Sequence, residues 1–161
     1  SGLVGSEMCI RDRFTVTQPF DAPARTVWDA LIDWKGHETW IPATKVEIHT
    51  DGDPTAIGSE FTATTGYGPL ALPDTMRVTR CAWDDDAGTG DCEVEKLGPV
   101  LTGRAGFTIE PTSETASEVV WIEDVKVRYL PRVLAPIAKV AGAAGFRLGM
   151  RKLGKLSLIH I

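Results

Sequence analysis

Three charged residues fall on the apolar side of predicted strands, where a buried molecule would meet them. Between positions 117 and 129 the apolar side chains occupy alternate positions, and Glu123 belongs to this apolar row. The same alternation places Asp74 and Lys96 on the covered side of two other strands. A buried charge needs a partner, which a lysine among carboxylates provides. The cluster is therefore either a structural ion pair or a site where a carboxyl group orients a ligand or acts as a general acid or base.

His37 is an acid–base candidate besides Glu123 and Asp74. It lies between Trp34 and Trp40 in a short predicted helix. No nucleophile accompanies it in the sequence, and a structural role is more common for such a histidine, so we assign no catalytic residue. The sequence lacks a glycine-rich phosphate loop and the HExxH and Gly-x-Ser-x-Gly signatures. We therefore expect neither a cofactor nor a metal site.

A strongly curved sheet would bring these residues together. Strand patterns cover 14–18, 45–50, 60–65, 75–83, 92–97, 103–110 and 118–129. Successive strands joined by short polar turns are typical of an antiparallel meander. Helix patterns cover 21–33, with Asp21 as the expected N-cap, and also 35–40 and 131–153. These elements predict an α+β fold in which two short helices and a long last helix accompany a sheet of about seven strands.

The inward positions of the strands and one stripe of the last helix define an expected cavity wall. We predict the ligand-binding residues to be Trp40, Phe61, Ala63, Tyr67, Asp74, Met76, Val94, Lys96, Phe107, Ile109, Trp121, Glu123, Val125, Ile137, Ala141, Ala144 and Leu148. A slip of one residue in any strand would invert its row. Beside that stripe the last helix carries small residues, among them Gly145 and Gly149, which indicate either close packing or room for a ligand.

The cysteine pattern argues against a disulfide framework. Alternation places Cys81 on the solvent-facing side with Arg77 and Thr79, whereas Cys92 points inward with Val94. Side chains on opposite faces of a hairpin do not readily form a disulfide. Neither cysteine has a partner at metal-ligand spacing.

Length and composition predict one globular domain, at 14–154. The chain has 161 residues, of which 43% are hydrophobic and 24% charged. A formal net charge of -5 argues against a nucleic-acid partner. We expect a cytoplasmic protein without an integral membrane segment, because no apolar run could cross a bilayer and no signal peptide is recognisable. The segments 1–13 and 155–161 resemble translated sequencing-adapter read-through, so we expect them to be foreign to the native protein.

The element order and several short motifs resemble the SRPBCC superfamily. The motifs are PFDAP at 19–23, WIP at 40–42, GYGPL at 66–70 and WIEDV at 121–125. This superfamily has the helix-grip fold, a curved antiparallel sheet around a long C-terminal helix. It includes START-like lipid carriers, pollen-allergen proteins and bacterial polyketide cyclase/dehydrase domains. The resemblance implies a hydrophobic cavity between the sheet and the last helix, and it does not imply a shared reaction.

Three functions remain open at this point. The first is binding or transport of a hydrophobic small molecule, such as a lipid, a polyketide or an aromatic metabolite. The second is a cofactor-independent cyclase or dehydratase that uses Glu123 and Asp74 as acid and base. The third is peripheral membrane contact or protein interaction through the last helix, where Phe146, Met150 and Leu153 lie away from the sheet-facing stripe. The sequence leaves the oligomeric state open.

Overall fold

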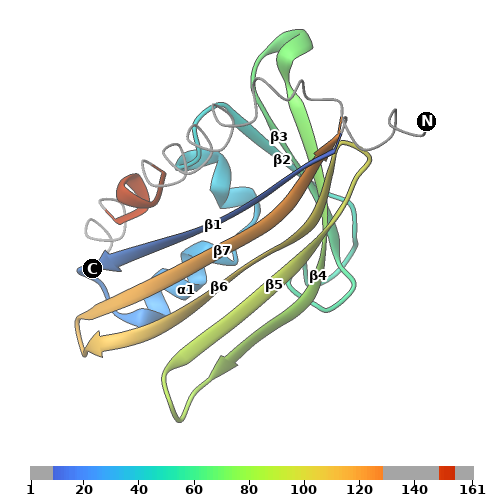
Figure 1. Ribbon diagram of the computed structural model, residues 1–161. Coiled ribbons are helices and arrows are strands. Elements are labelled where there is room, and N and C mark those ends of the chain that lie inside the picture. The colour runs from blue at the N-terminus through green and yellow to red at the C-terminus, as the bar shows by residue number, and fades with distance from the viewer. Residues whose placement is uncertain (1–8, 129–148, 155–161) are drawn as a thin grey trace.

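The computed structural model describes residues 9–128 and 149–154, and its main element is one antiparallel sheet of seven strands (Figure 1). The strands are β1 (Cys9–Phe20), β2 (Thr44–Ile48), β3 (Glu60–Thr65), β4 (Leu72–Asp84), β5 (Thr89–Leu97), β6 (Leu101–Ser113) and β7 (Ala116–Arg128). Their order across the sheet is β1-β7-β6-β5-β4-β3-β2, so the last six form a meander and β1 pairs with β7. The predicted seven-stranded antiparallel sheet is confirmed.

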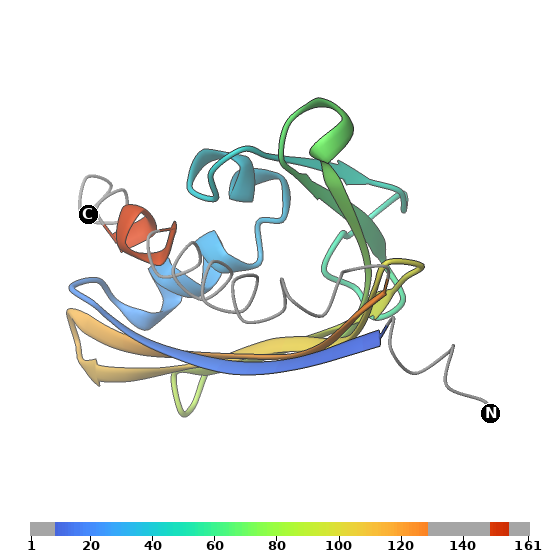
Figure 2. The same ribbon diagram turned by 45° about the horizontal axis from the view of Figure 1, so that its top comes forward.

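The helices of the N-terminal half lie on the concave side of this sheet, as Figure 2 shows for α1 (Ala24–Leu31) and the 3₁₀ helix η1 (Lys35–Thr39). A further 3₁₀ turn, η2 (Gly68–Leu70), belongs to the loop between β3 and β4. The predicted N-cap Asp21 is wrong, because α1 starts after Pro23 and has no side-chain cap. Asp21 lies two residues before the N-cap position, which Pro23 occupies.

Helix α1 packs its apolar stripe against the sheet. Val27, Trp28 and Leu31 are buried, and each burial contributes on the order of 2 kcal/mol. The Trp28 ring lies 5.5 Å from the ring of Phe107 in β6. Gly90 in β5 permits this approach, since a Cβ atom there would lie 2.3 Å from Trp28 Cε3. The helix thereby closes one end of the concave face.

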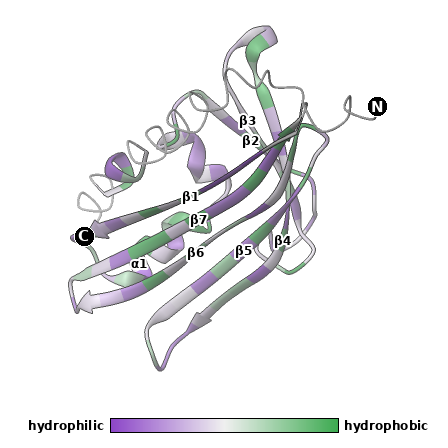
Figure 3. Cartoon of the chain, in the orientation of Figure 1, coloured by the Kyte–Doolittle hydropathy of each residue, from purple (hydrophilic) through white to green (hydrophobic). Residues whose placement is uncertain are grey.

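Side-chain alternation holds along most of the sheet, and Figure 3 shows hydrophobic and hydrophilic residues alternating along the strands. In β5 the buried positions are every second residue, including Cys92, Val94 and Lys96. The same pattern buries Ala105, Phe107 and Ile109 in β6. Strands with this period have one face against the core and one in water, so the predicted inner and outer faces of these strands are confirmed.

Strand β4 interrupts the alternation with a β-bulge. The register with β5 shifts between Val78 and Arg80, and both Thr79 and Arg80 are exposed. An inserted residue turns every later side chain to the other face. Cys81 is therefore on the inner side, directly opposite Cys92 in β5. The prediction that these two cysteines face opposite sides of the hairpin is wrong.

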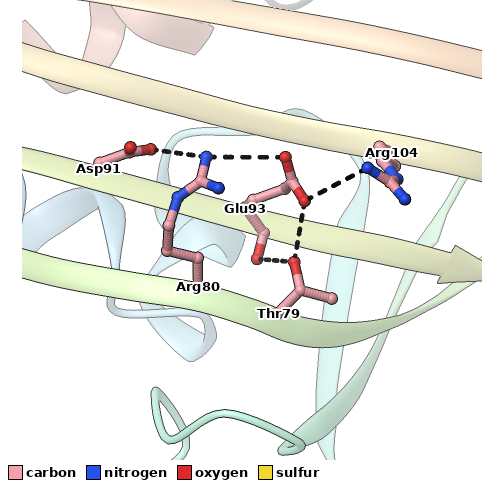
Figure 4. A network of polar contacts seen from close by, with 5 residues as sticks. All are labelled: Thr79, Arg80, Asp91, Glu93 and Arg104. Atoms are coloured by element: carbon pink, nitrogen blue, oxygen red, sulfur yellow. Dashed lines mark hydrogen bonds and ion pairs between the residues drawn. The ribbon is translucent and has the colours of Figure 1, made fainter.

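The convex face of the sheet carries cross-strand charges, which Figure 4 shows around Glu93. Arg80 of β4 lies 3.1 Å from Asp91 and 3.6 Å from Glu93, both in β5. Thr79 donates a hydrogen bond to the Glu93 carboxylate, and Arg104 of β6 lies 4.0 Å from it. Pairs as exposed as these contribute at most about 1 kcal/mol each, so the network marks the solvent-facing side more than it stabilises the sheet.

The described part of the C-terminal region, residues 149–154, is helical. Met150 and Leu153 are 0% and 3% exposed and belong to the hydrophobic core. The expectation that they form an outward-facing apolar patch is wrong. A Cβ atom on Gly149 would lie 3.1 Å from the Trp40 carbonyl oxygen, so this small residue serves close packing. Most of the predicted helix 131–153, with Ile137, Ala141, Ala144, Phe146 and Leu148, lies outside the described residues.

Strand β1 begins earlier than the predicted segment 14–18. Its residues from Cys9 onward pair with β7, and Asp12 lies opposite Val125. Residues 9–13 are therefore part of the sheet, and the prediction that the domain starts at residue 14 places this boundary too late. Their foreign origin stays a prediction, and residues 155–161 lie outside the described part of the chain.

Candidate functional site

A cavity of about 200 Å³ lies on the concave side of the sheet. Its wall comes from β2 to β7 and from the segment around η1. The predicted ligand-binding residues that line it are Phe61, Ala63, Asp74, Met76, Val94, Lys96, Phe107, Trp121 and Glu123. The candidate His37 lines it as well. The volume is far above the roughly 15 Å³ that one water molecule needs.

Four other predicted wall residues lie elsewhere among the described residues. Trp40, Ile109 and Val125 are buried in the core but do not line the cavity. Tyr67 is 79% exposed in the loop before η2. For Ile109 and Val125, strand alternation predicts which face of the sheet the side chain is on. It does not predict whether that part of the face borders the cavity or packs in the core. The helix residues Ile137, Ala141, Ala144 and Leu148 lie outside the described residues.

Several residues that line the cavity were not predicted from the sequence. Trp34 and Ile41 flank η1, Leu72 starts β4, and Leu101 starts β6. Leu72 and Leu101 stand at the ends of strands, where alternation is weakest. Trp34 carried a detectable signal, because it precedes His37 by three residues and so shares a helical face with it. Thr44, where β2 starts, adds a polar contact by hydrogen bonding to Thr65 in β3.

Two stacked aromatic pairs form the apolar part of the cavity wall. Trp34 and Phe61 have ring centroids 4.7 Å apart and planes 9° apart. Phe107 and Trp121 have centroids 5.4 Å apart and planes 8° apart. All four residues line the cavity. Such rings offer large apolar surfaces of fixed orientation, which suit a ligand with a flat or extended hydrocarbon body.

The three charged residues of the sequence analysis meet at the cavity wall. Lys96 Nζ donates a hydrogen bond to Asp74 Oδ2 and lies 3.8 Å from Glu123 Oε1. It also lies 3.8 Å from the sulfur of Met76. The side chains of Lys96, Asp74 and Glu123 are only 4%, 16% and 18% exposed. One ammonium group therefore serves two largely buried carboxyl groups.

The surroundings shift the protonation of this cluster. Burial acts to lower the pKa of Lys96, but Glu123 and Asp74 outweigh it and raise that pKa, so Lys96 is an ammonium at neutral pH. Burial raises the pKa of Glu123 above its ordinary value, against the opposing effect of Lys96. Asp74 and Asp12 raise the pKa of Glu123 further by repulsion. Glu123 thus holds a proton more readily than an exposed glutamate does.

One oxygen of Asp74 is left for a ligand. Asp74 Oδ1 is buried and has no hydrogen-bond partner among the described residues, while Oδ2 accepts a bond from Lys96. A buried acceptor without a donor costs about 1–3 kcal/mol. A hydroxyl or amine of a bound molecule would satisfy this oxygen. The neighbouring Asp12 was missed because it belongs to the segment set aside as a tail, although it shares an alternating row with the buried Val16.

His37 has a structural hydrogen bond. Its Nε2–H donates to the Leu31 carbonyl oxygen at 2.7 Å, and the side chain is buried. Its ring lies 5.6 Å from that of Trp34 and 4.7 Å from that of Trp40. Burial lowers the pKa of His37 below its ordinary value, so the ring is neutral at pH 7. The unprotonated Nδ1 of this tautomer can accept a proton or a hydrogen bond.

Within 9–128 and 149–154, no group of three or more His, Cys, Asp or Glu side chains could hold a metal ion. Among these same residues, no helix has the length and hydropathy to cross a membrane.

Comparison with known proteins gives a family and a fold. The family described as polyketide cyclase/dehydrase and lipid transport matches residues 11–157. No curated protein matches the sequence. Among solved structures, the aromatase/cyclase ZhuI from Streptomyces sp. R1128 has a TM-score of 0.63 and 16% identity, with 92% of this chain and 94% of that chain covered.

Two further structures have the same fold. Norcoclaurine synthase from Thalictrum flavum, solved with dopamine and hydroxybenzaldehyde, has a TM-score of 0.62 and 16% identity, with 100% of this chain and 94% of that chain covered. A Thermobifida fusca protein solved by NMR has a TM-score of 0.62 and 19% identity, with 91% and 92% covered. At these identities the likeness concerns the fold alone.

Proposed function

Because the chain belongs to the polyketide cyclase/dehydrase and lipid transport family, we propose that it binds a hydrophobic small molecule in the cavity of its curved sheet. The membership confirms the SRPBCC resemblance of the sequence. The family description includes both enzymes and lipid transport, so the site itself has to distinguish between them.

The observation that carries the proposal is the two-part cavity wall. Stacked rings of Trp34 with Phe61 and of Phe107 with Trp121 form an apolar part. The Asp74–Lys96 pair forms a polar part, where a carboxylate oxygen lacks a partner among the described residues. We infer an amphipathic ligand whose hydrocarbon body contacts the rings and whose hydroxyl, carbonyl or amine group reaches the charged cluster.

Binding can be measured with the neutral fluorophore N-phenylnaphthylamine, whose emission rises in an apolar site. We expect saturable binding to the wild-type protein and a loss of about tenfold or more in affinity for Ala63→Trp, which fills the cavity wall. The matched control is Thr64→Trp, the next residue of β3 on its opposite face. The proposal fails if the two variants bind the fluorophore equally well.

An enzymatic role is the second candidate, and the raised pKa of Glu123 favours it. A general base works best with a pKa near the working pH. In this scheme the Glu123 carboxylate takes a proton from the carbon next to a ligand carbonyl. The Lys96 ammonium donates a hydrogen bond to the carbonyl oxygen, which becomes the enolate oxygen. Asp74 holds Lys96 in place.

The enzymatic role can be tested by following deuterium exchange at the acidic carbon of a bound tetralone by NMR. We expect Glu123→Gln to lower the exchange rate by about a hundredfold while fluorophore binding persists. The control is Glu93→Gln, an acid on the outer face of β5. Exchange at the wild-type rate in Glu123→Gln would rule out this role and leave the binding proposal intact.

The third function considered from the sequence has lost most of its support. It required an outward-facing apolar helix end, and Met150 and Leu153 are buried in the core. Phe146, the third residue of the predicted apolar helix end, lies outside the described residues. We therefore do not extend the proposal to membrane or protein contact through this helix.

A further inference from the structure

Cys81 and Cys92 form a pair of free thiols between β4 and β5 that ligand binding does not explain. They are direct partners in the register of the two strands, because the bulge before Arg80 turns Cys81 to the inner face. Directly opposite residues of antiparallel strands have Cα atoms about 4.5 or 5.5 Å apart. Both spacings fall within the range of about 4.4–6.8 Å that a disulfide spans.

As direct register partners, the two side chains lie next to each other on the inner face of the hairpin. Cys92 lines the ligand cavity beside Val94 and Phe107, and Cys81 packs at the border of the same core. The backbone spacing of the pair is therefore compatible with a disulfide.

The two thiols differ in the way that a stepwise exchange requires. Cys81 is partly exposed, whereas Cys92 is 2% exposed. The hydrogen bond from Cys92 lowers the pKa of Cys81, although burial acts against this. The same contact, together with burial, raises the pKa of Cys92. Thiolate content and access both favour Cys81 as the first nucleophile.

We propose that Cys81 and Cys92 are a modification site that forms a reversible intramolecular disulfide with small disulfide oxidants. The Cys81 thiolate attacks one sulfur of the oxidant, forming a mixed disulfide and releasing one small thiolate. Cys92 then loses its proton to solvent and attacks the Cys81 sulfur, which releases the second small thiolate. The protein pair is oxidised by two electrons, and the oxidant is reduced to two thiols. The inference does not rest on the proposed ligand.

The reaction can be followed by mass spectrometry of the folded chain with oxidised glutathione, in a Cys9→Ser background. Trypsin cleaves after Arg80 and Lys96, so one peptide, 81–96, contains both cysteines. We expect this peptide to become lighter by two hydrogen atoms and to return to its original mass with dithiothreitol. A folded protein that keeps both thiols free, or reacts only after denaturation, overturns the proposal.

Single-cysteine variants test the order of attack. Cys92→Ala is expected to stop at a stable glutathione adduct on Cys81, because no second thiol is available. Cys81→Ala is expected to react at least about tenfold more slowly, because the remaining thiol is buried. Equal reaction rates of the two variants would contradict the assignment of Cys81 as the attacking thiol. Circular dichroism of each variant shows whether it is folded. The mass measurement on the Cys9→Ser protein, which keeps both thiols, tests the proposal even if a single-cysteine variant does not fold.

Discussion

Replacing Lys96 with methionine tests the charged cluster at its centre. The substitution keeps an unbranched apolar side chain and removes the only ammonium group that the described residues place beside Asp74 and Glu123. All three side chains are less than a fifth exposed, so water does not replace the lost partner. Removing one partner of a buried ion pair costs about 3–5 kcal/mol. We expect Lys96→Met to lower the free energy of unfolding by this amount at pH 7.

The assay is urea unfolding followed by tryptophan fluorescence, with Arg77→Met as the matched control. Arg77 pairs with Glu60 on the outer face, with 46% and 33% of the two side chains exposed. Its loss should cost no more than about 1 kcal/mol. Adding Asp74→Asn to Lys96→Met should recover part of the stability, since it removes one uncompensated charge.

The pH dependence of the Lys96→Met variant gives a second check. Without the ammonium group, burial raises the pKa of Glu123 still further in the folded state. A carboxyl group with a raised folded-state pKa favours folding below its ordinary value of 4.5, and this contribution is lost as the pH rises. The free energy of unfolding of Lys96→Met should therefore be closest to that of the wild type near pH 4, and the difference should be largest at neutral pH. A loss equal to that of Arg77→Met at all pH values would refute the buried cluster.

Three further predictions concern packing and protonation. Gly90→Ala should lower stability by about 1–3 kcal/mol, as measured by urea unfolding, because its Cβ would overlap Trp28; adding Trp28→Phe should recover part of it, and a neutral Gly90→Ala would contradict this packing. The free energy of unfolding of the wild type should fall relative to that of His37→Gln as the pH drops below 6.5, because histidine there becomes protonated in the unfolded state first. If the unfolding free energies of the two proteins changed with pH in parallel, His37 would not be neutral and buried. The free energy of unfolding of Glu123→Gln should rise relative to that of the wild type as the pH rises above 4.5, since the variant lacks a carboxyl group that resists ionisation. A difference in unfolding free energy that stays constant with pH would contradict the raised pKa of Glu123.

Strand periodicity predicted most of the sheet and of the cavity wall. Periodicity predicts side-chain direction correctly where one face of a strand packs on the core and the other faces solvent. This is the case in β5, where Val94 and Lys96 alternate with exposed or half-buried residues. The charged residues Asp74, Lys96 and Glu123 were predictable because a charge in an apolar row is conspicuous. Their closeness in space follows from the sheet order, which the short turns between strands already implied.

The errors arose where a local feature interrupts the period. One inserted residue at the bulge after Val78 reversed the face of Cys81, and nothing in the residue types there indicates a bulge. Tyr67 has the ring expected of a cavity wall, but the loop geometry points it to solvent, where it is 79% exposed. Asp12 was not predicted for a different reason, because its segment resembles read-through and so was expected to lie outside the fold.

The most direct test of the cavity as a ligand site is NMR of the methionine methyl groups during addition of N-phenylnaphthylamine. Met76 lines the cavity. Met150 is buried in the core and is not one of the described residues that line the cavity. Cavity binding predicts a saturable shift of the Met76 methyl signal with an unchanged Met150 signal, and both signals can be assigned through leucine variants. A fluorophore that binds while Met76 stays unshifted, or that shifts Met150 as strongly, would contradict the proposed site.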